Sequence, residues 1–208
     1  MIAVGYEKLQ GAYLRDILDQ PRALQQTIAG LERMPALEAL VADLRGGRRR
    51  RIVLTGMGGS YHILHPLHLR LIARGFDCSL AETSELVWTM PALLAPENVV
   101  IAVSQSGESA EIVRLLAHSA PLFVGVTNTP GSTLATHAAI TILTRAGQEA
   151  AVSCKTAITA MAALDWLGEH LAGGDLPAVR RELEQVVPAA ANYLSGWREH
   201  VATLVGAL

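Results

Sequence analysis

The sequence predicts a three-layer α/β/α fold in which a five-stranded, parallel, doubly wound sheet lies between helices, with extra helices at both termini. Three observations predict this class. Short apolar runs alternate along the chain with segments of helical periodicity. The apolar runs have no polar face, which is typical of parallel strands covered on both sides. Half of the 208 residues are hydrophobic and only 4% are aromatic, so we expect a large aliphatic core.

The first 45 residues have the pattern of helices. Apolar residues recur there at helical spacing, and Pro21 and Pro35 interrupt the pattern. A Gly-Gly pair at 46–47 ends it.

After this leader the period changes, and strands alternate with helices. We expect strands at 52–55, 76–81, 99–103, 122–126 and 140–143. We expect helices at 61–73, 85–94, 109–117 and 155–171, and a helical stretch at 179–208 around Pro188. Right-handed crossovers between the strands then give the doubly wound sheet.

Composition and charge exclude several classes of protein. Seventeen basic and nineteen acidic residues give a net charge of −2, which argues against a nucleic-acid partner. The basic run Arg48–Arg51 precedes the first strand, and we interpret it as a solvated loop. No apolar run approaches the length of about 18 residues that a membrane helix needs, and the start does not resemble a signal peptide. We therefore expect no membrane contact and a cytoplasmic location.

The sequence gives no sign of a metal or a cofactor. Cys78 and Cys154 are isolated, so they form neither a disulfide framework nor a zinc motif. His62, His65 and His68 span too wide an arc of one helix to converge on a metal ion.

Doubly wound sheets bind ligands beyond the carboxyl ends of their strands, where the strand order reverses. That rule points to the turns after the first and third strands. The first turn, 56–60, is rich in glycine, but Tyr61 stands where a dinucleotide fingerprint needs a third glycine. It also lacks the lysine of a triphosphate-binding loop.

The second turn, Ser104–Ser109, concentrates three hydroxyls and an amide at the start of a helix. Hydroxyls and free backbone N–H groups there suit an anion such as a phosphate. The alternative is plain helix capping by Ser104 or Ser106, for which one serine is enough. We expect Glu108 to point away from the anion, towards a neighbouring loop or a sugar hydroxyl. The turn Thr127–Ser132 either lines the same site or is simply a turn.

Together these stretches resemble the sugar isomerase (SIS) domain family. The resemblance rests on 58–62, on Ser104–Ser109, on Thr127–Ser132 and on the helix start Val152–Thr156, in an order and spacing that match from about residue 50 to 172. The leader segment 13–21 is similar to the helix that precedes the isomerase half of the glucosamine-6-phosphate synthases of that family.

The resemblance implies a division of the chain, a reaction and a set of binding residues. It implies a helical leader over 1–47, a phosphosugar-binding SIS domain over 48–172, and C-terminal helices over 173–208 that lead towards a second SIS half. The family interconverts aldose and ketose phosphosugars, in some members with amination or deamination. The implied substrate-binding residues are Ser60, Ser104, Gln105, Ser106, Ser109 and Ser153.

The chain also departs from the synthases. Met1 leads directly into the helical leader, without a glutaminase domain, so we expect no glutamine-dependent synthesis. The synthases keep their base in a second SIS half, and this sequence ends at Leu208. Glu149 is the best carboxylate for an enolisation base, and the alternative is an acid that stabilises a helix start. Lys155 either forms a Schiff base with a ketose or sits in a structural ion pair.

We therefore expect a domain that binds a hexose or aminohexose 6-phosphate within an isomerase or an amino-sugar-converting enzyme. A non-catalytic sensor or regulatory module is the alternative, because it would keep the serine turn and lack the base. A third hypothesis is a structural half that completes a neighbour's site. The apolar terminal helices suit a homodimer.

Overall fold

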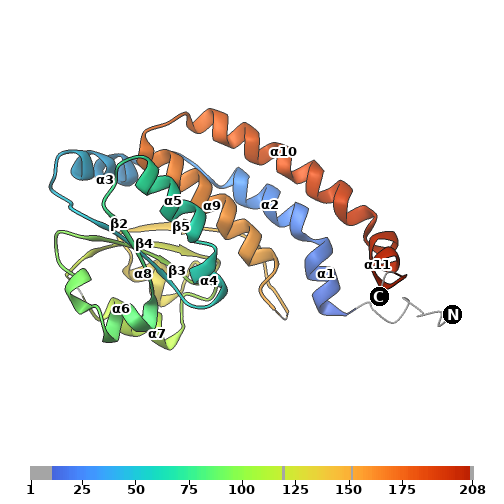
Figure 1. Ribbon diagram of the computed structural model, residues 1–208, viewed down its shortest axis with the longest axis horizontal. Coiled ribbons are helices and arrows are strands. Elements are labelled where there is room, and N and C mark those ends of the chain that lie inside the picture. Colours follow the sequence, from blue (N-terminus) through green and yellow to red (C-terminus); the bar gives the residue numbers. More distant parts are fainter. Residues whose placement is uncertain (1–10, 119, 151, 207–208) are drawn as a thin grey trace.

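The computed structural model describes residues 11–118, 120–150 and 152–206, and it has three layers (Figure 1). The central layer is one sheet of five parallel strands in the order β2-β1-β3-β4-β5. The strands are β1 (Ile52–Gly56), β2 (Cys78–Glu82), β3 (Val99–Val103), β4 (Leu122–Thr127) and β5 (Ile140–Leu143). This sheet confirms the predicted fold class.

Helices cover both faces of the sheet because its strands are apolar on both sides. In β3, Val99 and Ile101 join the core on one face, while Val100 and Ala102 join the core on the other. The first layer, on the first face, holds α3 (Pro35–Arg45), α5 (His65–Ala73) and α9 (Lys155–Ala172), and α2 (Gln20–Ala29) and α10 (Leu176–Ser195) join the same core by packing on α9. The second face is covered by α6 (Thr83–Trp88), α7 (Ala110–Leu116) and α8 (Thr133–His137).

Two helices differ from the prediction. The segment 61–73 is not one helix: α4 (Gly59–His62) ends early, and α5 starts again at His65 with Pro66 in its first turn. Proline has no N–H to donate and fits best at a helix start, so it favours this restart. The segment 85–94 is also divided, because α6 stops at Trp88 and a short 3-10 helix, Pro91–Leu93, follows.

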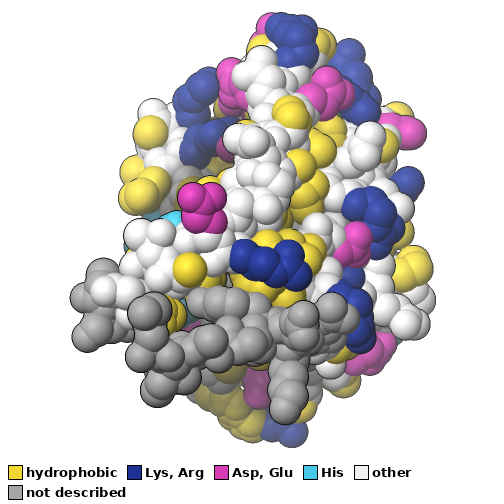
Figure 2. All heavy atoms as spheres, turned by 90° about the vertical axis from the view of Figure 1, so that its right-hand side faces the viewer, with side chains coloured by type: hydrophobic (Ala, Val, Ile, Leu, Met, Phe, Trp, Pro, Cys, Tyr) yellow, Lys and Arg dark blue, Asp and Glu magenta, His cyan; other side chains and the backbone are white. Residues whose placement is uncertain are grey.

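The terminal helices extend the first layer beyond the sheet. Helix α1 (Ala12–Leu18) leads into α2, which packs against both α9 and α10. Helix α10 continues through Pro188 and is followed by α11 (Trp197–Gly206), none of whose described residues is buried. Figure 2 faces this end of the molecule, and yellow hydrophobic side chains reach the surface there among charged ones. Within the described residues, no helix is long and apolar enough to cross a membrane.

The basic run lies at the amino edge of the sheet. The Arg48 guanidinium pairs with Asp43, and Arg51 Nε lies 2.9 Å from Asp77 Oδ1. These exposed pairs fit the prediction of a solvated loop.

The strand order reverses between β1 and β3, which are neighbours although β2 separates them in the chain. Gly56, at the end of β1, stands opposite Val103, at the end of β3. The turn after β1 folds back tightly, since a Cβ atom at position 56 would lie 2.8 Å from the Ser60 carbonyl carbon. The two turns singled out by the sequence therefore lie side by side at the carboxyl edge.

Candidate functional site

A cavity of about 220 Å³ opens at this carboxyl edge; we call it the polar cavity because hydroxyl and amide groups lie among its apolar lining residues. It brings together four of the predicted site residues: Ser60, Ser104, Gln105 and Ser153. Ser106, Ser109 and Glu149 are not among the residues that line it. The remaining lining residues are Met57, Gly59, Ile63, Val103, Val126, Thr127, Asn128, Thr144, Thr156, Ala157 and Ala160.

The serine-rich turn is held in shape by its own hydrogen bonds. Ser104 N donates to Val126 O (3.1 Å), and Ser104 Oγ accepts from Gly107 N (3.1 Å). Gly107 has a φ of 67°, and a Cβ atom there would overlap the Ser132 side chain. A glycine is therefore required both by the backbone angle and by the close approach of the next loop.

The last serine of the turn caps a helix. Ser109 Oγ accepts from Ile112 N (3.4 Å) at the start of α7, so the cap of this helix is Ser109 and not Ser104 or Ser106. Ser106 Oγ accepts from Glu108 N (3.2 Å) and remains partly exposed. Both residues belong to the serine-rich turn, and neither lines the cavity.

Glu108 points away from the cavity, as expected. Its carboxylate accepts hydrogen bonds from the backbone N and the Oγ1 of Thr133, at the start of α8. These hydrogen bonds lower the pKa of Glu108. The negative charge is therefore directed towards a neighbouring loop.

The turn after β4 contributes two residues whose role the sequence left open. Thr127 Oγ1 donates to Gln105 O (3.2 Å), which joins this turn to the serine-rich one. Asn128 Nδ2 donates to Gly147 O (2.8 Å), and its Oδ1 accepts from Thr144 Oγ1 (3.1 Å). Asn128 therefore connects the ends of β4 and β5, a role that turn composition alone does not reveal.

Glu149 lies in the loop between β5 and α9, where it caps the helix. One carboxylate oxygen accepts from the backbone N–H groups of Cys154 and Lys155 (2.6 Å each), and the other accepts from Thr156 Oγ1. Partial burial raises the pKa of Glu149, but these hydrogen bonds outweigh burial and hold the pKa below its usual value. The carboxylate meets the cavity through the Thr156 hydroxyl.

Lys155 is buried, with 4% of its surface exposed, and sits in a structural ion pair. Its Nζ lies 2.9 Å from Asp16 Oδ1 and 3.2 Å from Asp19 Oδ2. Burial lowers the pKa of Lys155, but the two carboxylates outweigh it and raise the pKa. The ammonium is thus held charged, which is the opposite of what a Schiff-base lysine needs.

In the part of the chain that the structure describes, no acidic, basic or thiol side chain lines the polar cavity. Its polar groups are hydroxyls and amides, which both donate and accept hydrogen bonds. Such a lining suits a ligand with many hydroxyl groups.

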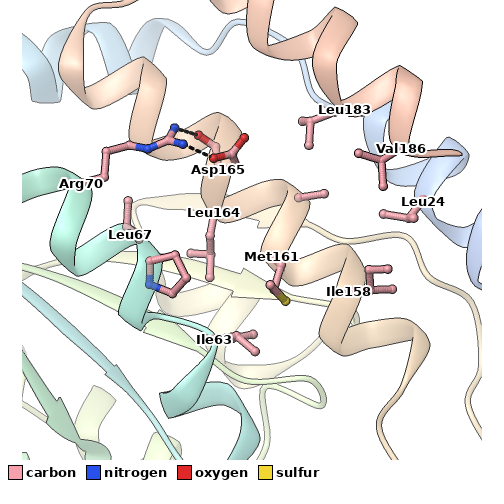
Figure 3. Close-up of a pocket in the computed structure, with 12 residues that line it drawn as sticks. Leu24, Ile63, Leu67, Arg70, Ile158, Met161, Leu164, Asp165, Leu183 and Val186 are labelled. Atoms are coloured by element: carbon pink, nitrogen blue, oxygen red, sulfur yellow. Dashed lines mark hydrogen bonds and ion pairs between the residues drawn. The ribbon is translucent and has the colours of Figure 1, made fainter. Parts of the chain in front are cut away.

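A second, larger hollow of about 370 Å³ is apolar (Figure 3). Its walls come from α2, α5, α9 and α10, and Arg70 and Asp165 pair at one end. Met161 and Val186 line it and are 46% and 43% exposed. Few groups there can bind a polar ligand, so we treat it as a packing surface.

Comparisons with known proteins agree with this architecture. The SIS domain family matches residues 48–169. A glutamine–fructose-6-phosphate aminotransferase (isomerizing) from Pyrococcus horikoshii is 31% identical over 175 residues, which are 80% of this chain and 28% of that protein. One from Aeropyrum pernix is 34% identical over 145 residues, which are 67% of this chain and 23% of that protein. The chain thus spans about a quarter of the length of these curated relatives.

Among solved structures, the C-terminal domain of glucosamine-fructose-6-phosphate aminotransferase from Francisella tularensis superimposes with a TM-score of 0.71 and 21% identity. That match covers 89% of this chain and 56% of the other.

Proposed function

Since this chain belongs to the SIS domain family, we propose that the polar cavity at the carboxyl edge of its sheet binds a phosphorylated sugar, specifically a hexose or aminohexose 6-phosphate. The observation that supports this proposal is the convergence of Ser60, Ser104, Gln105 and Ser153 on one cavity. These residues come from three separate segments of the chain, and plain helix capping does not require them to meet.

We assign the roles that the resemblance implies. The hydroxyls of Ser104, Ser106 and Ser109 hold the phosphate, with help from Gln105; of these four residues, Ser104 and Gln105 line the cavity, and Ser106 and Ser109 belong to the same turn. Ser60 and Ser153 contact the sugar from opposite sides. A sugar phosphate has two parts to recognise, the charged phosphate and the sugar hydroxyls. We therefore assign one set of residues to the phosphate and another set to the sugar.

Binding is tested with the Ser106→Ala variant by calorimetry, using fructose 6-phosphate and glucosamine 6-phosphate. We expect the affinity to fall about tenfold, the effect of losing one hydrogen bond to a charged group. The matched control is Ser195→Ala, whose hydroxyl bonds to Asn192 O at the far end of α10. An unchanged affinity in Ser106→Ala would contradict the assignment.

We further propose that the intact enzyme moves a proton between adjacent carbons of the open-chain sugar, as in aldose–ketose isomerisation or a related amino-sugar conversion. That step needs a base. Glu149 is the candidate in this chain, although its carboxylate reaches the cavity only through Thr156. The test is fructose 6-phosphate conversion, with and without ammonia, in the wild type and in Glu149→Gln. Loss of turnover with retained binding would support Glu149 as the base.

A non-catalytic sensor or regulatory module is the second candidate function. The observation that favours it is that no described residue lining the cavity has an acidic or basic side chain. Sugar-phosphate binding without any turnover by the wild type would support this candidate.

We also propose a homodimer, in which a second copy stands where the synthases of this family have their second SIS half. The apolar hollow between α5, α9 and α10 is the surface that we assign to this contact. A base from the second copy would then complete the site.

A further inference from the structure

Helix α1 is tied to the loop between β5 and α9, although 134 residues separate them (Figure 1). Asp16, on α1, is 7% exposed. Its Oδ2 accepts a hydrogen bond from Ala150 N (2.8 Å), and its Oδ1 lies 2.9 Å from Lys155 Nζ. The hydrogen bond from Ala150 and the contact with Lys155 lower the pKa of Asp16, so the carboxylate stays ionised.

The Lys155 ammonium holds the same loop from a second direction. It donates to Gln148 O (2.7 Å) and pairs with Asp19 Oδ2. Gln20 Nε2, one residue later, donates to Cys154 O (3.4 Å). The end of α1 and the start of α2 therefore contact the loop directly at Ala150 and Cys154, and they reach Gln148 only through Lys155.

This loop forms one wall of the polar cavity. Ser153 and Thr156 line the cavity, and their hydroxyls bond to each other. Thr156 Oγ1 also donates to Glu149, which accepts from two backbone N–H groups at the start of α9. Thr156 is the second residue of α9, so a shift of the loop would move the Ser153 hydroxyl and change the bonds that hold the Thr156 hydroxyl.

The structure assigns Asp16 as a positioning residue: by holding Ala150 N and Lys155 Nζ, it fixes the loop that presents Ser153 and Thr156 to the sugar. The inference rests on the proposed phosphosugar site and deepens it. Asp16 itself does not line the cavity, so its effect passes through the loop.

The phosphate side of the cavity is held mainly by another element. The serine-rich turn bonds to Val126, Thr127 and Asn128 at the end of β4, and none of these hydrogen bonds involves α1. Asn128 also bonds to Gly147 O, in the loop between β5 and α9, but Asp16 contacts that loop three residues later, at Ala150. Asp16 should therefore affect recognition of the sugar hydroxyls and leave recognition of the phosphate intact. A merely structural ion pair would affect both ligands equally or neither.

The test uses Asp16→Ala, which removes both contacts, and Asp16→Asn, which keeps an oxygen for Ala150 N and removes the charge facing Lys155. Affinities for fructose 6-phosphate and for inorganic phosphate are measured by NMR titration on protein whose circular dichroism shows it folded. We expect Asp16→Ala to weaken fructose 6-phosphate about tenfold and to change inorganic phosphate less than about twofold. Amide hydrogen exchange should accelerate over 148–154 and stay unchanged in β1 and β3.

The matched control is Asp43→Ala, which removes the carboxylate paired with Arg48 at the opposite edge. It should change neither affinity nor exchange over 148–154. Equal weakening of both ligands, or no change in affinity and exchange, would overturn the assignment. If Asp16→Ala does not fold, the same criteria apply to Asp16→Asn. If the wild type binds neither probe, the phosphosugar site is wrong, and the exchange over 148–154 alone decides whether Asp16 holds the loop.

Discussion

Gly107 combines a backbone angle that favours glycine with a neighbouring side chain, Ser132, that leaves no room for a Cβ atom. We expect Gly107→Ala to lower the free energy of unfolding by about 2 kcal/mol and to weaken sugar-phosphate binding, because the serine-rich turn must shift. Urea unfolding and calorimetry measure the two effects. Gly131→Ala is the control, since its Cβ atom meets nothing within 4 Å, and it should stay within about 0.5 kcal/mol of the wild type.

Glu149 makes a pH-dependent contribution to stability whose sign follows from its lowered pKa. The unfolded chain has a pKa near the ordinary value of about 4.3, so the ionised carboxylate stabilises the fold above that pH. This contribution is lost as the pH falls through the lower, folded-state pKa. The difference in unfolding free energy between wild type and Glu149→Gln should therefore be largest near neutral pH and shrink below about pH 4. Chemical unfolding across this pH range measures it, and a difference that grows on acidification would contradict the prediction.

The sequence pointed to the hydroxyl groups of the candidate site better than to the residues that support them. Ser104 stands in an unusual turn, and the resemblance to the SIS family implied Ser60 and Ser153, so all three could be named before the fold was known. The contact of Asp16 with Lys155 joins residues 139 positions apart, and no local pattern signals it. The role of Asn128 could not be predicted either. Asparagine is common in turns, so its presence at this position did not indicate contacts with the end of β5.

At the scale of elements, the contribution of a helix cap to stability can be measured at the start of α10. Asp175 Oδ1 accepts from Ala178 N (3.0 Å) at the start of this 20-residue helix. Asp175→Ala should lower the free energy of unfolding by about 1 kcal/mol, because Ala178 N loses its side-chain acceptor and keeps only the Asp175 backbone carbonyl. Asp175→Asn keeps an oxygen at the same position and should retain most of the stability. Thermal and urea unfolding compare the two variants, and equal losses would mean that the cap does not act through this oxygen.

The helices and strands could be predicted where hydrophobic periodicity is strong. They could not be predicted where a capping side chain determines that a short helix forms. The five strands lie within two residues of their expected positions, since runs such as 99–103 have only one way to be buried on both faces. Helix α8 was not expected, because its five residues are too few for a periodic pattern. It is stabilised by Ser132, whose Oγ accepts from Ala135 N (3.2 Å).

At the scale of the whole molecule, the first layer leaves apolar surface without a partner among the described residues. Helix α11 has no buried residue there, and α10 buries only Val179 and Leu183. A ten-residue helix is marginal in water without tertiary contacts. Met161 and Val186 remain exposed around the apolar hollow. The proposed contact with a second copy would cover this exposed apolar surface.

We therefore predict that the chain sediments as a dimer and that Val186→Glu weakens the dimer at least about tenfold, because a charge would be buried in an apolar contact. The control is Val113→Glu on α7, in the opposite layer, where the side chain is 44% exposed against 43% for Val186. It should leave the dimer intact, and because both valines are half exposed, neither change should unfold the monomer. Sedimentation velocity across a concentration series measures the equilibrium. A wild type that remains monomeric at about 100 μM, far above the dissociation constant of a specific interface, would remove this contact from the proposed function.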